Sequence, residues 1–146
     1  MSTRSNIGII KENDTIDMIY CHWDGYPSNN GKILLANYSN TDAVRELIAL
    51  GDLSNLGEVI GEKHDFNYGM TFKPGTPEYN ALARQCNVYS RDRVETGTKA
   101  RKSLSLRKAM ELMEEYLYLW DTKNSKWFYS DHGSELIPLT QKSCKE

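Results

Sequence analysis

Residues 15–23 constrain the fold most, because their side chains are largely apolar on both sides of an extended backbone. Alternate side chains of a β-strand point to opposite faces of its sheet. One face would carry Ile16, Met18, Tyr20 and His22, and the other Asp17, Ile19, Cys21 and Trp23. Since both faces need to be covered, this pattern predicts a central strand with packed layers on both sides.

Further strands are predicted before and after this segment. Residues 4–11 precede it across a polar turn at 12–14, which gives a first hairpin. The clearest hairpin joins 116–120 and 127–129 through the polar loop 121–126. Residues 86–94 read as another strand, in which Arg91 and Arg93 would share a face. Residues 135–139 can add a short edge strand, where Pro138 is tolerated.

Three main helices are predicted from capping residues and apolar spacing. The first runs over 41–50, after a short helical segment at 31–38. The second starts with Thr76 as N-cap and Pro77 in its first turn, and it extends to Arg84. The third follows Ser105 and extends to residue 114 or so. Residues 62–85, which include this second helix, otherwise lose their periodicity, and this predicts a long irregular excursion.

These elements predict an α+β fold, an antiparallel sheet of about five or six strands with two or three helices packed on it. The 146 residues suit one domain over 1–140, followed by a flexible tail at 141–146. No apolar run reaches the roughly 20 residues that cross a bilayer, and the N-terminus has no signal-peptide pattern. A cytoplasmic protein is therefore expected, with reduced thiols at Cys21, Cys86 and Cys144.

The net charge of −2 conceals one basic segment. Residues 91–108 contain seven Lys or Arg against Asp92 and Glu95, so this segment carries +5 and the remainder −7. One basic segment on an acidic chain favours a local anion site over a surface that coats nucleic acid. The alternative interpretation is a solvated loop and helix start.

Residues 20–31 hold the densest group of polar and aromatic side chains, and they turn the chain at Gly25 and Pro27. A phosphorylated ligand with a base needs flat aromatic surfaces, arginine forks and turn amides. The predicted ligand-binding residues are Arg4, His22, Trp23, Asp24, Tyr26, Arg91 and Arg93. The alternative is an aromatic belt whose arginines pair with Asp24, Asp92 and Glu95.

Catalytic and metal-binding chemistry receive less support. A free Ser2 or Thr3 can act as a nucleophile, and His22 with Asp24 can form an acid–base pair. A lone histidine beside a tryptophan is more often a hydrogen-bonded structural residue. The candidate metal ligands lack a standard spacing, so neither a metal nor a cofactor is expected. They are Cys21, His22, His64, Asp65, Cys86, Asp131 and His132.

Residues 63–73 offer a different kind of site, because large apolar side chains alternate along them. These side chains are Phe66, Tyr68, Met70 and Phe72. The alternation is typical either of an edge that pairs with another protein or of a further strand of the core sheet.

Two motifs stand out along the chain. The first is Ser-Thr-Arg-Ser at 2–5 with Ile7, then Tyr20, His-Trp-Asp-Gly-Tyr-Pro at 22–27, and Gly31 with Leu34 and Leu35. The second is Arg-Asp-Arg at 91–93 with Glu95. In both motifs the chain resembles a group of small proteins carried mainly by tailed bacteriophages and prophages, and the resemblance implies Gly at the position that Val94 occupies.

The resemblance implies a phage accessory protein, and it carries over no catalytic role. Small phage proteins without enzymatic motifs often counter bacterial immunity. The leading hypothesis is that the protein, in the host cytoplasm, sequesters a small nucleotide-type signal and does so as a homo-oligomer. The main alternative is an inhibitor that binds a host effector protein, such as a CRISPR nuclease, through residues 63–73. A third is a small hydrolase acting through Ser2 or His22.

Overall fold

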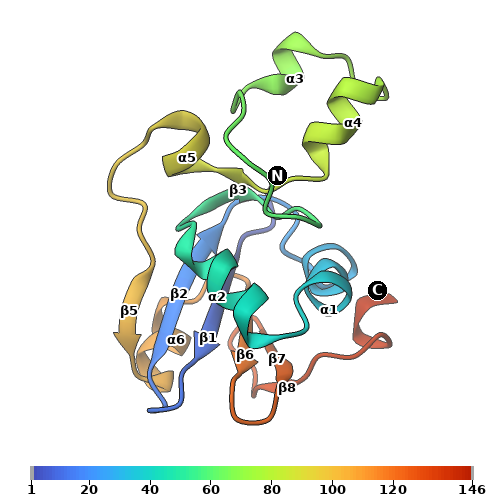
Figure 1. The fold of residues 1–146 in the computed structure, drawn as a ribbon. Helices are drawn as coiled ribbons and strands as arrows, with labels where there is room; N and C mark the ends of the chain where they lie inside the picture. Colours follow the sequence, from blue (N-terminus) through green and yellow to red (C-terminus); the bar gives the residue numbers. More distant parts are fainter. Residues whose placement is uncertain (1, 146) are drawn as a thin grey trace.

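The computed structural model describes residues 2–145 and places one mixed eight-stranded sheet at the centre of the molecule (Figure 1). The strand order is β4-β3-β2-β1-β6-β7-β8, and β5 pairs with β2. The strands are β1 Ser5–Ile10, β2 Ile16–Cys21, β3 Leu53–Asn55, β4 Asn87–Val88, β5 Arg101–Leu104, β6 Tyr116–Asp121, β7 Lys126–Asp131 and β8 Ile137–Pro138. The helices are α1 Lys32–Asn37, α2 Thr41–Ala49, α3 Tyr68–Thr71, α4 Pro77–Ala83, α5 Tyr89–Arg93 and α6 Leu106–Leu112.

The sheet is not purely antiparallel, so that part of the prediction is wrong. β1 pairs antiparallel with β2 but parallel with β6, and β2 pairs parallel with β3. Parallel neighbours need a long crossover and leave no turn signature between them. The pairing of β1 with β6 spans most of the chain, so it depends on packing and not on local sequence.

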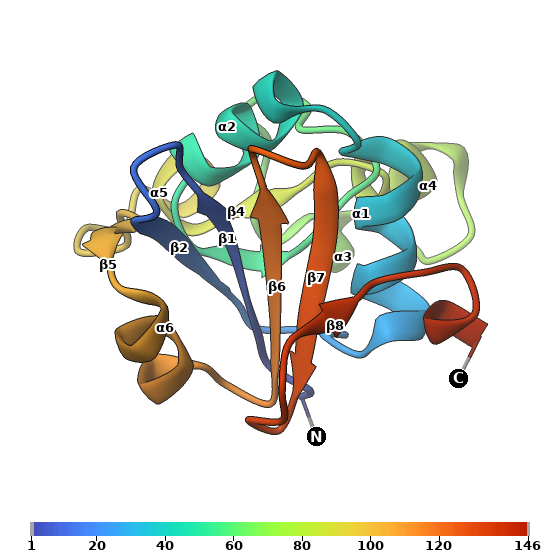
Figure 2. The same cartoon turned by 90° about the horizontal axis from the view of Figure 1, so that it is seen from below.

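β2 is a central strand covered on both faces, as its alternating pattern predicts. Ile19 and Cys21 belong to the main core, together with side chains of α1 and α2. Ile16 and Met18 belong to a smaller core on the opposite face, where they pack with Ala109 of α6. The sheet therefore has α1 and α2 on one side and α6 on the other (Figure 2).

The predicted helices form, and their capping residues are used as expected. The side chain of Asn40 accepts from the backbone N–H of Ala43 at the start of α2. Thr76 and Ser105 cap α4 and α6 in the same way. The hairpin of β6 with β7 and the edge strand β8 are also present.

Residues 86–94 are not the predicted strand. Only Asn87–Val88 is extended, and Tyr89–Arg93 forms the short helix α5, which therefore removes the strand alternation of Arg91 and Arg93. The physical cause is Asp92, whose carboxylate accepts from the backbone N–H of Val88 at 2.8 Å and closes the turn. β3 and β5 are strands that the sequence analysis left unplaced.

Residues 61–85, which we call the lobe, project beyond β3 and carry α3 and α4 (Figure 1). The apolar alternation at 66–72 does not form a strand, because α3 takes Tyr68–Thr71. The Tyr68 ring is buried and lies 5.2 Å from the Tyr79 ring of α4, measured between centroids. The lobe is therefore held together by a small aromatic contact of its own.

The three cysteines are buried thiols without disulfides. Burial raises the pKa of Cys21 to about 12, so this thiol stays protonated and unreactive at neutral pH. Cys144 lies in a final 3₁₀ turn at Ser143–Lys145, packed against the π-helical turn Pro27–Gly31. Over residues 2–145, no helix has the length and apolar character needed to cross a bilayer.

Candidate functional site

The turn that follows β2 is locked to the N-terminal segment through Gly25. Its N–H donates to the carbonyl of Thr3 at 2.9 Å, and its carbonyl accepts from the buried Tyr118 hydroxyl at 2.6 Å. A Cβ atom at this position would lie 2.7 Å from Cβ of Ser5. Glycine is thus required by close packing, since the two segments approach more nearly than a side chain permits.

Asn30 completes this connection from inside the protein. Its buried side-chain amide donates to Ser5 Oγ at 3.1 Å and contacts Cys21 Sγ at 3.5 Å. Several residues of the first motif therefore act as a scaffold that joins the start of β1, the end of β2 and the turn. The side chains that remain exposed on this scaffold are the candidates for recognition.

Four of the motif side chains form one surface, which we call the open patch: Arg4, Tyr20, His22 and Trp23. Tyr20 and His22 follow Met18 on the α6-side face of β2, beyond the part that α6 covers. The Tyr20 hydroxyl lies 2.6 Å from His22 Nδ1, and the His22 and Trp23 ring centroids lie 4.8 Å apart at 86°. The Trp23 side chain is 44% exposed.

The Tyr20 hydroxyl fixes the hydrogen-bonding role of His22. Partial burial raises the pKa of the Tyr20 phenol, while the nearby Arg4 guanidinium acts in the opposite direction. The phenol is therefore neutral at pH 7 and can donate to His22 Nδ1. In the tautomer that accepts this bond at Nδ1, Nε2 carries the proton and can donate to a ligand.

A small hollow of about 230 Å³ adjoins Tyr20 at the edge of β2, between the stretches that pair with β5 and β3. It is lined by Asn6, Met18, Ile19, Tyr20, Asp52, Arg101 and Glu114. The Asp52 carboxylate fills the gap in strand pairing by accepting from the backbone N–H of Tyr20 at 2.9 Å. Burial raises the pKa of Asp52, and the Tyr20 N–H and Arg101 limit the shift.

Asp24 and Tyr26, two further predicted site residues, belong to different surroundings. The Tyr26 hydroxyl donates weakly to Asp24 Oδ1 at 3.4 Å, and the Asp24 carboxylate raises the pKa of the Tyr26 phenol. Asp24 has φ 56°, a left-handed backbone that ends the strand geometry after Trp23. It lines a separate hollow beside α4, so a His22–Asp24 acid–base pair does not form.

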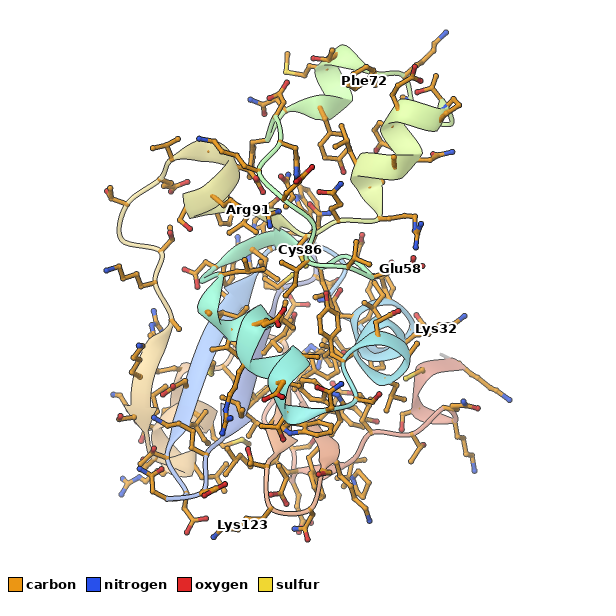
Figure 3. All side chains as sticks on the ribbon, viewed as in Figure 1. Lys32, Glu58, Phe72, Cys86, Arg91 and Lys123 are labelled. Carbon is orange, nitrogen blue, oxygen red and sulfur yellow. The ribbon has the colours of Figure 1, made fainter. Side chains whose placement is uncertain are left out.

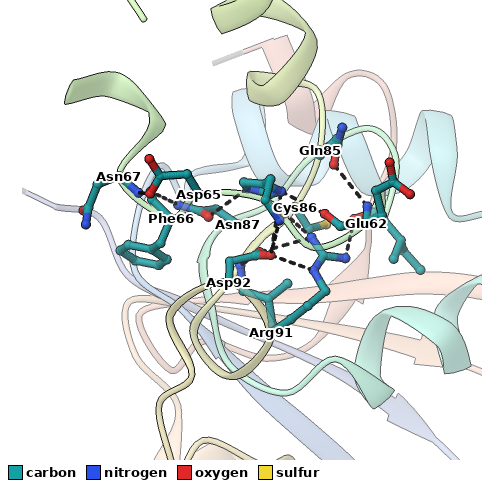
Figure 4. A network of polar contacts seen from close by, with 12 residues as sticks. Glu62, Asp65, Phe66, Asn67, Gln85, Cys86, Asn87, Arg91 and Asp92 are labelled. Atoms are coloured by element: carbon teal, nitrogen blue, oxygen red, sulfur yellow. Dashed lines mark hydrogen bonds and ion pairs between the residues drawn. The ribbon is translucent and has the colours of Figure 1, made fainter. Parts of the chain in front are cut away.

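Arg91 and Asp92 form a second polar centre, which we call the latch (Figure 4). Arg91 donates to the carbonyls of Ile60 and Cys86 at 2.9 and 2.8 Å and to both carboxylate oxygens of Asp92. Asp92 is buried and also accepts from the backbone N–H of His64. In Figure 3, Arg91 lies beside Cys86 where the lobe meets the sheet. Every guanidinium nitrogen of Arg91 is therefore engaged inside the chain.

Neighbouring contacts extend the latch along the base of the lobe. His64 Nε2 lies 3.1 Å from Asn87 Oδ1, and the Asn87 amide donates to the carbonyl of Phe66. Arg93 pairs with Glu95 at 3.3 Å and lies over the Phe66 ring at 5.0 Å. The alternative interpretation, in which these arginines pair with Asp92 and Glu95, is thus confirmed for both.

The predicted site residues therefore divide into three groups. Arg4, His22 and Trp23 come together, whereas Arg91 and Arg93 lie at the lobe base and Asp24 and Tyr26 beside the turn. Sequence reasoning missed Asp52, Arg101 and Glu114, which reach the patch through long-range packing of strands and loops. Tyr20 was detectable, since it belongs to the first motif.

Within residues 2–145, no three His, Cys, Asp or Glu side chains are grouped as a metal ion would require. Comparison with protein-family models, with curated proteins and with solved structures finds no match for this chain. The phage-protein resemblance therefore stays a prediction, and we infer function from the geometry of the site.

Proposed function

We propose that the protein binds a small nucleotide-type signal at the open patch and, as a phage accessory protein, sequesters it from a bacterial immune response. The observation that supports this most is the chain of contacts from Tyr20 to His22 and from His22 to Trp23, with Arg4 near Tyr20. These residues place an exposed indole, an imidazole donor and a guanidinium within one surface.

Each member of the open patch has a distinct task in this proposal. The half-exposed Trp23 indole stacks on the base, a contact worth about 1–3 kcal/mol per base in nucleic-acid-binding proteins. Arg4 holds a phosphate through a charge-assisted fork. Arg4 is exposed, and it forms no ion pair with any other described residue. His22 Nε2–H adds an oriented donor, because Tyr20 fixes the ring.

Arg91 is not part of the proposed site, although its sequence context predicted it. Its guanidinium donates to the carbonyls of Ile60 and Cys86, which flank the lobe, so replacing Arg91 would destabilise the fold. The positively charged side chains proposed to contact the ligand are Arg4 and Arg101. Arg101 lines the adjoining hollow.

The size of the hollow favours a ligand enclosed by more than one subunit. About 230 Å³ lies below the 300–1,000 Å³ of usual small-molecule sites. A second copy facing the patch would cover the exposed side of a bound nucleotide. The proposal therefore includes a homo-oligomer.

Tryptophan fluorescence tests the proposal, because Trp23 is 44% exposed while Trp120 and Trp127 are 1% and 3% exposed. Titration with AMP, cyclic di-AMP and cyclic di-GMP should quench one component of the emission for at least one nucleotide. Trp23→Phe should remove the quenching, and Arg4→Gln should weaken binding about tenfold. Arg107→Gln, an exposed charge loss on α6, is the matched control and should bind normally. Quenching that survives in Trp23→Phe would refute the site.

A second candidate function, direct inhibition of a host effector protein, is favoured by the lobe. The lobe projects from the sheet, and Met70 on α3 is 88% exposed (Figure 1). Phe66 is a poor probe of this surface because it packs on Tyr89 and under Arg93. Met70→Ser is the better probe. In a plaque assay on a defended host, loss of phage protection with Met70→Ser but not with Arg4→Gln would select the lobe over the patch.

A further inference from the structure

A second basic surface lies on the other side of the sheet from the open patch. It is a groove of about 560 Å³ between α2 and the segment that leads into β5. The groove is lined by Ile9, Lys11, Asp17, Arg45, Ile48, Ala49, Leu50, Gly51, Ser90, Lys99, Ala100 and Lys102. Ile9 and Ile48 belong to the α2-side core, whereas the patch lies on the α6-side face.

The alternation of β5 separates the two surfaces. Arg101 lines the hollow next to Tyr20, and its neighbours Ala100 and Lys102 line the groove. Successive side chains of an extended segment point to opposite faces, so one short stretch supplies a cation to each side. The basic segment found in the sequence is therefore divided between two sites.

The charges around the groove are unbalanced. Its lining contains Lys11, Arg45, Lys99 and Lys102 against one carboxylate, Asp17, which gives a local charge of +3. The whole chain carries −2, so the rest carries −5. Positive groups gathered in a concave, partly apolar surface focus the potential and attract anions.

The carboxylate does not cancel the remaining cations, because it is already engaged. Asp17 Oδ1 lies 3.0 Å from Lys11 Nζ and accepts from the backbone N–H of Ser103 at 2.9 Å. Arg45 has only a distant contact of 3.9 Å with the exposed Asp42. In the described part of the chain, neither Lys99 nor Lys102 forms an ion pair. Arg45, Lys99 and Lys102 are therefore available to an external anion.

The floor of the groove determines what kind of anion fits. Ile9 and Ile48 are almost fully buried beneath it, so the apolar surface that the groove exposes comes from Ala49, Leu50 and Ala100. An inorganic ion would leave this apolar surface unused, and a volume of about 560 Å³ is in the range of small-molecule sites. We infer that the groove binds a phosphorylated small organic molecule, with the phosphate between Lys99, Lys102 and Arg45 and the apolar body over Leu50 and Ala100.

The test is a ¹H–¹⁵N NMR titration of the full chain with 1-naphthyl phosphate. The expected result is a set of saturable shifts at the amides of Ala49, Leu50, Gly51 and Ala100, weakening as salt is raised. The double variant Lys99→Gln/Lys102→Gln should bind about tenfold or more weakly. Lys63→Gln/Lys73→Gln removes the same charge from the exposed lobe and should bind as the wild type does.

Three results would overturn the inference. One is the absence of saturable shifts at the groove amides. Another is equal weakening by the lobe control, which would mean unspecific charge attraction. The third is tighter binding of an oligo-glutamate peptide than of naphthyl phosphate, which would make the groove a protein-docking surface. Trp23→Phe should leave the groove titration unchanged, so failure here and failure at the open patch are distinguishable.

Discussion

The open patch and the latch each contain an arginine, Arg4 and Arg91, yet the two arginines are used in different ways. In the latch, Arg91 donates to two backbone carbonyls and to Asp92, and it is largely covered. In the open patch, Arg4 is exposed beside Tyr20, where its charge partly offsets the rise that burial causes in the pKa of the Tyr20 phenol. The Arg91 guanidinium stabilises the fold, whereas the Arg4 guanidinium can bind a ligand.

The backbone around each arginine explains why Arg4 is available to a ligand and Arg91 is not. Arg91 lies where three backbone segments converge, so unpaired carbonyls compete for its donors. Arg4 directly precedes β1, and the pairing of β1 with β2 and β6 already satisfies the neighbouring backbone groups. Availability of a charged side chain therefore depends on whether nearby backbone groups need a partner.

Arg91→Ala is the change that tests the comparison most severely. It leaves the Asp92 carboxylate buried and two carbonyls without their donor, so the free energy of unfolding should fall by about 3–5 kcal/mol. Arg4→Ala should change it by no more than about 0.5 kcal/mol. Urea unfolding of both variants measures the difference. Equal effects of the two substitutions would break the distinction between latch and patch.

Gly25→Ala tests the scaffold beneath the open patch. The new Cβ would lie 2.7 Å from Cβ of Ser5 and 3.0 Å from the carbonyl carbon of Arg4. Such overpacking should cost about 1–3 kcal/mol of unfolding free energy. Gly69→Ala is the matched control, because its Cβ meets its nearest atom at an ordinary 3.7 Å. A neutral effect of Gly25→Ala would show that the turn can move away from β1.

Val94→Gly should stabilise the end of α5. Val94 has φ 55° and ψ 39°, a left-handed conformation that is strained for a β-branched residue. Glycine adopts this conformation freely. Relief of the strain outweighs the added flexibility of the unfolded chain, for a gain of about 1 kcal/mol. Thermal unfolding measures it, and a lower melting temperature would contradict the explanation.

Asp52→Asn is expected to have the smallest effect on the free energy of unfolding, and this effect depends on pH. The folded protein holds the Asp52 proton more tightly than the unfolded chain does, because burial raises the pKa of Asp52. The stability from protonated Asp52 is present below about pH 4 and is lost as pH rises through the raised pKa. The free energy of unfolding of Asp52→Asn, relative to that of the wild type, should therefore increase from pH 3.5 to pH 7. Urea unfolding at both values decides it, and a relative loss would contradict the assigned direction.

Much of the fold could be predicted from the sequence because its signals are local. The caps at Asn40, Thr76 and Ser105 and the two apolar faces of β2 specify their elements directly. The parallel pairings, β3 and β5 could not be predicted in this way, because their partners are distant in sequence. Short strands with few apolar residues leave no periodic signal.

The candidate site was predictable to the extent that its residues share one motif. Arg4, His22 and Trp23 meet because Gly25 and Asn30 join the two halves of that motif. Arg91, like Arg4, is an arginine near aromatic residues in the sequence. No sequence pattern reveals that its guanidinium donates to the carbonyls of Ile60 and Cys86. The role of an arginine is decided by tertiary hydrogen bonding.

Native mass spectrometry tests the central claim, that the open patch holds a small ligand, most directly. The wild type, Arg4→Gln and Met70→Ser would be purified from cells with an active nucleotide-signalling defence and compared with denatured samples. We predict a bound species of several hundred daltons on an oligomer of the wild type and of Met70→Ser, and its loss in Arg4→Gln. A clean mass without ligand in all three would contradict the account.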